Sequence, residues 1–421
     1  MLCGLNSGED MTLWEQLFFR AFRHSPETNV RRIGRYAIFF AIASTVITVA
    51  ADPSWAQTEK VLYSFTNGAD GANPTAGLVL DASGNLYGTT VYGGSTTCTS
   101  GCGTVFRLSP RGTDIVLYSF LGGPVGAAPY GGLIRDAKGN LYGTTYAGGF
   151  FVGIVYEIEG RKESILHTFL GSMRNDGSVP FASLIMDAEG NLYGTSFSGG
   201  TKCTASGGCG TVFRVTPSGS ESLLYSFAGG TDGSFPFCSL AWGVNHSLYG
   251  TTVYGGANDL GTVFKVEPGG VETVVHSFGS GTDGSSPDAG LIADTAGNFY
   301  GTTPLGGDFG FGTVFKIDRT GAERVVYSFT GGVDGANPDA PLILDAKGNL
   351  YGTTYAGGMT GNGTVFEIDT EGAETVLYSF AGGADGANPG SAVVFDAKGN
   401  LYGTTINGGS AGYGTVFRVT P

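Results

Sequence analysis

Residues 345–354 read Asp-Ala-Lys-Gly-Asn-Leu-Tyr-Gly-Thr-Thr, and this stretch decides the fold because it returns throughout the chain. Its second half, Leu-Tyr-Gly-Thr-Thr or a near copy, starts at Leu86, Leu141, Leu192, Leu248, Phe299, Leu350 and Leu401. The steps between copies are 51 residues in four cases and 55 or 56 residues in the other two. Such a fixed period is typical of proteins that repeat one structural unit many times.

Each period contains further segments that have the composition of short strands. In the sixth copy the pattern predicts strands over Leu342–Leu344, Leu350–Thr354, Thr364–Ile368 and Thr375–Phe380. β-Branched and aromatic residues fill these segments, and Gly, Asn and Asp separate them. Four-stranded units that are apolar on both faces and occur seven times predict an all-β fold. We expect a single seven-bladed β-propeller with four antiparallel strands per blade.

The phase of the repeat predicts how the ring closes. Lys60–Phe65 has the composition of an outer strand but precedes the first Leu-Tyr-Gly motif, while Gly414–Val419 ends the last copy with no outer strand after it. We therefore expect Lys60–Phe65 to complete the last blade, which removes two free strand edges. The expected propeller domain is residues 57–421.

Residues 1–56 have the features of an export signal. Tyr36–Ala51 is an uncharged apolar run that follows Arg31, Arg32 and Arg35, and small residues at positions 54 and 56 offer a cleavage site before Gln57. A membrane anchor is the alternative, but the run is shorter than the roughly 20 residues that span a bilayer. The arginine pair leaves both the general and the twin-arginine export routes open. The mature chain is expected to be secreted, either extracellular or periplasmic, with no membrane span.

Composition narrows the classes of partner. The 421 residues carry 22 basic and 36 acidic side chains, a net charge of −14, which argues against nucleic acid. The four His residues and the absence of an Asp-x-Asp-x-Asp-Gly loop predict no metal site and no cofactor, with calcium left as an alternative that no recognised loop supports. We expect a monomer.

The cysteines suit an oxidising compartment. Cys98 and Cys102 lie in one enlarged loop and Cys203 and Cys209 in another, so each pair predicts a local disulfide. Cys238 aligns with small residues of other copies and is expected to be buried and unpaired.

One position departs from the repeat in a way that suggests a binding site. The residue after the loop proline is Thr75, Tyr130, Phe181, Phe237, Asp288, Asp339 and Gly390 around the ring. Aromatic faces stack on sugar rings and carboxylates accept hydrogen bonds from hydroxyls. We therefore expect Tyr130, Phe181, Phe237, Asp288 and Asp339 to bind a ligand near the mouth of the channel. Drift at an exposed loop position is the alternative.

Two other recurrent features are expected to be structural. An Asp-Gly pair follows six outer strands, and its Asp is interpreted as a turn residue, with a ring of cation-binding carboxylates as the alternative. His167 and His276 replace the Tyr of the Tyr-Ser-Phe motif, but no Ser-His-Asp site is evident and no catalytic residue is predicted.

Residues 345–354, followed by Gly357-Gly358 and by Gly-Thr-Val-Phe at 363–366, resemble the GloVer-type tandem repeats of exported bacterial proteins. The resemblance covers about residues 60–421. It implies a secreted or surface repeat protein, often with a variable C-terminal anchor, and no established activity. The Asp-x-x-Gly-Asn-Leu-Tyr core is also similar to the blades of NHL-type propellers.

Three functions remain open on the sequence. The first is non-catalytic binding of a glycan or an exterior protein through the face that carries the Asp-Gly loops. The second is a secreted carbohydrate-active enzyme, a hydrolase or lyase that uses carboxylates such as Asp288 and Asp339, whose separation would have to suit two-acid chemistry. The third is a structural component of the surface or matrix. Non-catalytic binding is favoured because the sequence shows no catalytic constellation.

Overall fold

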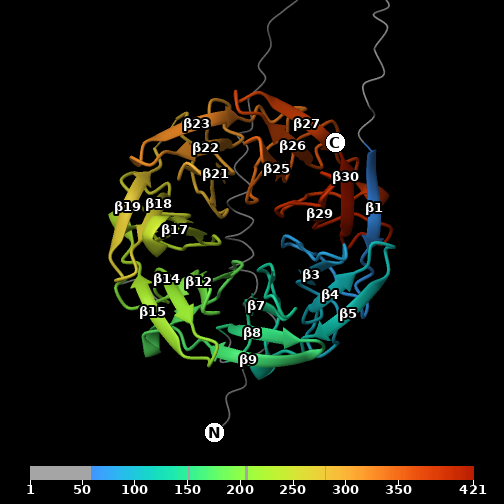
Figure 1. Cartoon of the computed structure of the whole chain (residues 1–421), viewed down its shortest axis with the longest axis horizontal. Coiled ribbons are helices and arrows are strands. Elements are labelled where there is room, and N and C mark those ends of the chain that lie inside the picture. The colour runs from blue at the N-terminus through green and yellow to red at the C-terminus, as the bar shows by residue number, and fades with distance from the viewer. Residues whose placement is uncertain (1–57, 150–151, 204–206, 280) are drawn as a thin grey trace, which may run out of the picture. The chain divides into compact units, whose positions relative to one another are not determined.

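The computed structural model describes residues 58–149, 152–203, 207–279 and 281–421. The predicted export segment, residues 1–56, lies outside the described residues. Trp55–Pro421 forms one compact unit, in which the strands are arranged as blades around a central opening (Figure 1). Seven four-stranded antiparallel sheets confirm the all-β, seven-bladed propeller.

Each blade runs from a short inner strand to a longer outer strand. The inner strands are β2 (Val79–Leu80), β6 (Ile134–Arg135), β11 (Ile185–Met186), β16 (Ala241–Trp242), β20 (Ile292–Ala293), β24 (Ile343–Leu344) and β28 (Val394–Phe395). The second strands are β3 (Leu86–Thr90), β7 (Leu141–Thr145), β12 (Leu192–Ser196), β17 (Leu248–Thr252), β21 (Phe299–Thr303), β25 (Leu350–Thr354) and β29 (Leu401–Thr405). The third strands are β4 (Thr104–Leu108), β8 (Ile154–Glu159), β14 (Thr211–Val215), β18 (Thr262–Val266), β22 (Thr313–Ile317), β26 (Thr364–Ile368) and β30 (Thr415–Thr420).

The outer strands belong to blades 7 and 1 to 6 in turn. They are β1 (Thr58–Ser64), β5 (Asp114–Ser119), β9 (Lys162–Thr168), β15 (Glu221–Ser226), β19 (Glu272–Ser277), β23 (Glu323–Ser328) and β27 (Glu374–Ser379). A small extra pair joins β10 (Gly177–Ser178) to β13 (Ser198–Gly199). Short 3-10 turns are η1 (Gly123–Val125), η2 (Ser172–Arg174), η3 (Gly230–Asp232), η4 (Val244–His246) and η5 (Gly383–Asp385). No helix within the described residues is long and apolar enough to cross a membrane.

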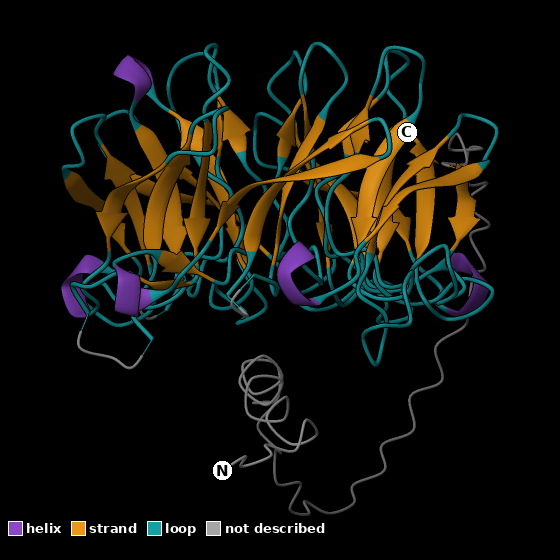
Figure 2. Cartoon of the chain, turned by 90° about the horizontal axis from the view of Figure 1, so that it is seen from below, coloured by secondary structure: helices purple, strands orange, loops and turns teal. Residues whose placement is uncertain are grey.

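The ring closes as the repeat phase predicts. β1 pairs antiparallel with β30, from Thr58 opposite Thr420 to Ser64 opposite Thr415. Figure 1 shows the blue β1 beside the red β30, and Figure 2 shows the strands running between two rims of loops. The last blade therefore contains strands from both ends of the described chain.

The sixth copy shows how closely the pattern predicts strand limits. β25 and β26 match the predicted ranges, whereas the inner strand begins one residue later, at Ile343. Leu342 lies just before this strand, with its side chain close to Gly352. The outer strand ends at Ser379, and the ring of the next residue, Phe380, lies 5.0 Å from that of Phe417 on the next blade.

The same kind of aromatic pair joins adjacent blades at each of the seven boundaries. The ring of Phe329 lies 5.1 Å from that of Phe366 on the next blade, in an edge-to-face arrangement. A Cβ atom on Gly352 would lie 2.6 Å from Cζ of Phe366, so only glycine leaves room for this ring. The other pairs are Phe65–Phe106, Phe120–Tyr156, Phe169–Phe213, Phe227–Phe264, Phe278–Phe315 and Phe380–Phe417.

Blade 2 carries the exception in this ring of pairs, and it gives a stability prediction. Tyr156 is fully buried and its hydroxyl has no hydrogen-bond partner, whereas the equivalent ring in every other blade is Phe. Tyr156→Phe should stabilise the fold by about 1 kcal/mol, because it removes an unsatisfied buried hydroxyl. Thermal unfolding should show a Tm higher by roughly 2 °C. A lower Tm would contradict this account of the site.

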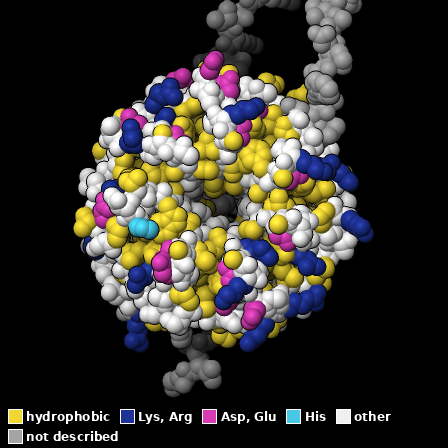
Figure 3. Space-filling view, viewed as in Figure 1, with side chains coloured by type: hydrophobic (Ala, Val, Ile, Leu, Met, Phe, Trp, Pro, Cys, Tyr) yellow, Lys and Arg dark blue, Asp and Glu magenta, His cyan; other side chains and the backbone are white. Residues whose placement is uncertain are grey.

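The predicted disulfides are confirmed. Cys98 is bonded to Cys102 and Cys203 to Cys209, while Cys238 is free and buried. On the face shown in Figure 3, hydrophobic side chains surround the central opening and charged side chains lie farther out.

Candidate ligand-binding site at the channel mouth

The residues after the loop prolines line up around the inner edge of the ring. Each proline packs on a glycine of the preceding blade. Cδ of Pro180, for example, lies 2.6 Å from the Cβ position of Gly153. Neighbouring copies are in direct contact, since the Thr75 hydroxyl donates to the carbonyl oxygen of Tyr130 over 3.3 Å. We call the seven residues that follow the prolines the mouth: Thr75, Tyr130, Phe181, Phe237, Asp288, Asp339 and Gly390.

Aromatic side chains form one continuous cluster on the mouth side of blades 1 to 4, with Phe181 at its centre. The ring of Phe181 lies 5.4 Å from that of Tyr130 and 4.5 Å from that of Phe237. All three side chains are half-buried, so part of each ring remains exposed. Five further rings extend the cluster, which we call the aromatic arc: Tyr92, Tyr146, Phe197, Phe235 and Tyr254.

The backbone of the arc adopts a conformation that its residues disfavour. The residue before the loop proline has a positive φ in all seven copies, and three copies place Asn there, which tolerates it. Val179 with φ 59° and Phe235 with φ 57° occupy this position at the entries to blades 3 and 4, and Ala128 and Ser286 occupy it in two other copies. Left-handed backbone at such residues costs of order 1–3 kcal/mol, and this kind of strain is concentrated at functional sites. The Phe235 ring lies 4.9 Å from that of Phe197, so the strained residue contributes directly to the arc.

Asp288 and Asp339 occupy the adjoining blades 5 and 6. Each side chain is half-buried, and one carboxylate oxygen of each is buried without a hydrogen-bond partner. Burial raises the pKa of Asp339 to about 7. Burial, followed by the charge of Asp339, raises the pKa of Asp288 well above its usual value. Near neutral pH the pair therefore offers both hydrogen-bond donors and acceptors. Gly390 in blade 7 adds no side chain beside Asp339.

The aspartates of the Asp-Gly loops hold their own turns. The Asp70 carboxylate accepts hydrogen bonds from the backbone N–H of Thr66 at 2.8 Å and of Gly68 at 3.1 Å. It also accepts one from the Tyr63 hydroxyl at 3.1 Å. This arrangement agrees with the prediction of a turn residue.

Five of the seven mouth residues are predicted from the sequence to bind a ligand, whereas the other rings of the arc are not. Those rings come from two further positions, the residue before the loop proline and the pair that follows Leu-Tyr-Gly-Thr-Thr. The pair that follows Leu-Tyr-Gly-Thr-Thr holds one aromatic residue in each of blades 1 to 4, but it also holds Tyr355 in blade 6, so the sequence pattern alone does not isolate the arc.

One known protein family matches most of this sequence. The model of the Gloeobacter/Verrucomicrobia repeat matches residues 45–206, 150–346 and 197–417, which together span most of the sequence. The chain belongs to the Gloeobacter/Verrucomicrobia repeat family. This confirms the resemblance drawn from residues 345–354. No curated protein matches this repeat protein in sequence.

Solved structures share the fold of this repeat protein. One is described as the extracellular domain of a hybrid two-component system from B. thetaiotaomicron, with 12% identity and a TM-score of 0.56 over 86% of this chain and 39% of that one. The chain thus spans well under two thirds of that relative. A gluconolactonase from Xanthomonas campestris matches with 15% identity and a TM-score of 0.43, over 86% of this chain and 89% of that one. A likeness this weak carries no inference about activity.

Proposed function

We propose that this chain is an exported, non-catalytic binding protein that takes a glycan at the mouth of the propeller. The aromatic arc is the observation that carries the proposal, because eight rings in contact occupy one side of the mouth and keep part of their surface exposed. Flat aromatic faces stack on the apolar faces of sugar rings. Asp288 and Asp339 supply the hydrogen-bonding groups that hydroxyls require.

Three further points support this assignment. The two disulfides suit an oxidising compartment, which is where an exported protein works. The positive φ recurs before the loop proline in all seven copies, but the bulky side chains of Val179 and Phe235 occupy it at the entries to blades 3 and 4, beside the arc. The propeller supplies a rigid frame, so the rings would be organised before the ligand binds, which lowers the entropy lost on binding.

The test is a thermal-shift screen of the mature protein against polysaccharides, with and without calcium. We expect at least one glycan to raise the Tm, and a variant with Tyr130, Phe181 and Phe237 all replaced by Ala to lose the effect. Stacking adds about 0.5–1.5 kcal/mol per ring beyond burial, so the triple variant should bind from about tenfold to about a thousandfold more weakly.

Controls separate binding from folding. Phe309→Ala removes an aromatic side chain that is 57% exposed and lies outside the arc, so it should bind as the parent does. Phe181→Leu keeps an apolar side chain at the centre of the arc but removes its flat face. If the triple variant binds every ligand of the parent equally well, the arc is not the site. If only proteins bind at the mouth, the partner is an exterior protein.

A second candidate function rests on the aspartate pair. Two carboxyl groups whose charges interact can divide the roles of general acid and base in glycoside hydrolysis, since the pKa of Asp339 is raised to about 7 and that of Asp288 well above its usual value. A hydrolase would release new reducing ends from the bound glycan. Asp288→Asn and Asp339→Asn would each abolish that release while leaving binding largely intact.

A further inference from the structure

The outer boundaries between blades share one arrangement of polar side chains, which we call a seam. Each seam joins the Tyr or His of one outer strand to an acid that begins, or nearly begins, the outer strand of the next blade. In six seams the Asp of the Asp-Gly loop lies between them. The seven strand acids are Glu59, Asp114, Glu163, Glu221, Glu272, Glu323 and Glu374. In every seam one carboxylate oxygen of this acid is buried and has no hydrogen-bond partner.

Five seams contain tyrosine, whose hydroxyl donates to the loop Asp in four of them and to Glu163 in the fifth. Tyr327 donates its hydroxyl to Asp334 over 3.2 Å, and Tyr378 donates to Asp385 over 2.8 Å. Where the tyrosine hydroxyl donates to the loop Asp, it already uses an oxygen of that carboxylate. Tyrosine also offers no nitrogen atom that could bind a metal ion. In these seams the repeated tyrosine therefore has a structural role.

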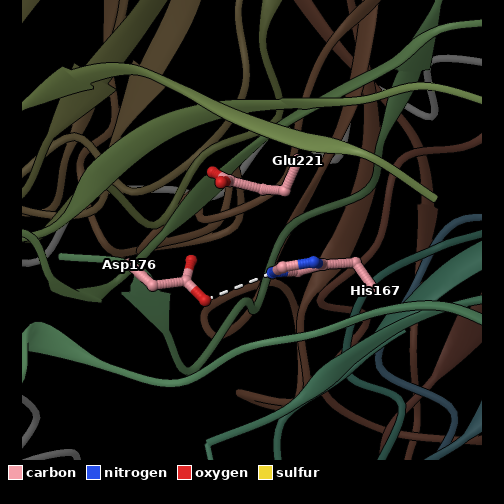
Figure 4. A group of neighbouring side chains, drawn as sticks. All are labelled: His167, Asp176 and Glu221. Atoms are coloured by element: carbon pink, nitrogen blue, oxygen red, sulfur yellow. Dashed lines mark hydrogen bonds and ion pairs between the residues drawn. The ribbon is translucent and has the colours of Figure 1, made fainter. Parts of the chain in front are cut away.

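Two seams carry histidine instead and differ in chemistry. His167 Nε2 lies 3.2 Å from Asp176 Oδ2, and Glu221 of the next blade faces them both (Figure 4). In the second, His276 Nε2 lies 3.3 Å from both carboxylate oxygens of Asp283, with Glu323 as the third member. In each group one ligand atom from every residue lies within 4.8 Å of the others. Within the described part of the chain, these are the two groups of this kind.

The donor set favours a divalent transition metal ion. One imidazole nitrogen and two carboxylates suit Zn²⁺ and its neighbours, whereas Ca²⁺ and Mg²⁺ prefer oxygen ligands alone. The two carboxylates balance the charge of the ion. Zinc bonds of about 2.0–2.2 Å place ligand atoms closer together than 4.8 Å, so small side-chain rotations would complete the contacts.

The position of the group also suits an ion taken up from solution. The side chain of His167 is 15% exposed and that of Asp176 is 7% exposed. The pair is thus shielded but reachable. The unpartnered oxygen of Glu221 supplies a ligand atom that the protein leaves unused. The three ligands come from β9, from the loop after it, and from β15 of the next blade, so an ion would tie two blades together.

We propose that the His167/Asp176/Glu221 and His276/Asp283/Glu323 seams each bind one divalent transition metal ion, of which Zn²⁺ is the probe of choice. Each site would have three protein ligands and leave a fourth position for water. The sites lie at the outer wall, apart from the mouth, and are independent of the proposed glycan site.

The chain supplies its own matched variants for the test. His167→Tyr and His276→Tyr convert each site into the Tyr–Asp–acid seam found at four other boundaries, so the fold should be retained. Isothermal titration of the untagged mature protein with Zn²⁺ should give two bound ions for the parent, one for each single variant and none for the double variant. Zn²⁺ should raise the Tm of the parent but not that of the double variant.

A variant that gains a third metal site provides a further test. Tyr327→His creates the same three-residue group with Asp334 and Glu374, and should raise the number of bound ions to three. Co²⁺ in place of Zn²⁺ should give a visible absorption band that scales with the number of sites. The proposal is overturned if the double variant binds as much Zn²⁺ as the parent, or if the parent binds none. It is also overturned if Tyr327→His still binds two ions.

Discussion

Removing β1 by deleting residues 57–66 should open the ring between blades 7 and 1. The deletion removes the ladder between β1 and β30 and the fully buried ring of Phe65, which lies 5.1 Å from that of Phe106. Loss of one buried Phe side chain alone costs about 3–5 kcal/mol. We therefore expect the Tm to fall by more than about 10 °C, measured by calorimetry. The exposed edge of β30 should also cause association, visible by size-exclusion chromatography.

A peptide supplied in trans provides the control for this deletion. A synthetic peptide of residues 57–66 should pair with the free edge of β30 and restore most of the Tm, as strand addition does elsewhere. A peptide of the same composition in scrambled order should not. A deletion variant that stays monomeric and melts like the parent would contradict closure by β1.

The second large effect expected is a loss of stability as the pH rises from about 4.5 to 8, and it arises from the seams. Burial, followed by the charge of a loop aspartate, raises the pKa of Glu59 and of Glu272 to about 8 and that of Glu374 to about 7. These carboxyls keep their protons in the folded chain to a higher pH than in the unfolded chain. Their contribution to stability is therefore complete below about pH 4.5 and is lost as the pH rises towards 8.

Aspartates in the turns between the first and second strands of the blades limit the stability at low pH instead. Burial alone would raise the pKa of Asp81, but hydrogen bonds from Asn85, Tyr87 and Ser83 outweigh it and lower the pKa. Asp187, Asp294 and Asp396 behave in the same way. Stability from these groups is present above about pH 4 and lost below it. The Tm should therefore be highest near pH 5 and several degrees lower at pH 9.

Replacing glutamate with glutamine in three tyrosine seams isolates this loss of stability with rising pH. A variant with Glu59, Glu272 and Glu374 replaced by Gln keeps a hydrogen-bond donor in each seam but has no proton to lose. Its Tm should change much less between pH 5 and pH 9 than that of the parent, in buffers without metal ions. An identical pH profile for parent and variant would show that the seams do not control this loss.

Sequence alone predicted the fold well because each repeat encodes its own strands. The motif at Leu350–Thr354 and the motif at Thr364–Ile368 are local patterns, and both strands were predicted to the residue. Closure followed from the phase of the repeat, since Lys60–Phe65 has only one place to pair. The disulfides followed from cysteines that are close in sequence.

The seams escaped prediction because each is assembled from three elements of two blades. The sequence predicts His167 as a variant of Tyr and Asp176 as a turn residue, whereas it gives no prediction for Glu221. Only the packing of blade 3 against blade 2 brings these side chains together. The strain at Val179 and Phe235 was likewise hidden, because a positive φ is expected of Asn or Gly and not of Val or Phe.

Pairing of β1 with β30 also sets the order in which this protein can complete its fold. During synthesis β1 leaves the ribosome long before β30 exists, and at about 5–20 residues per second the wait is roughly 20–70 s. Throughout that time the first strand made has no partner, and its charged residues Glu59 and Lys60 oppose pairing with other chains. β30 is therefore the last strand of the ring to be translated, and until it is made blades 1 to 6 can form but the ring cannot close.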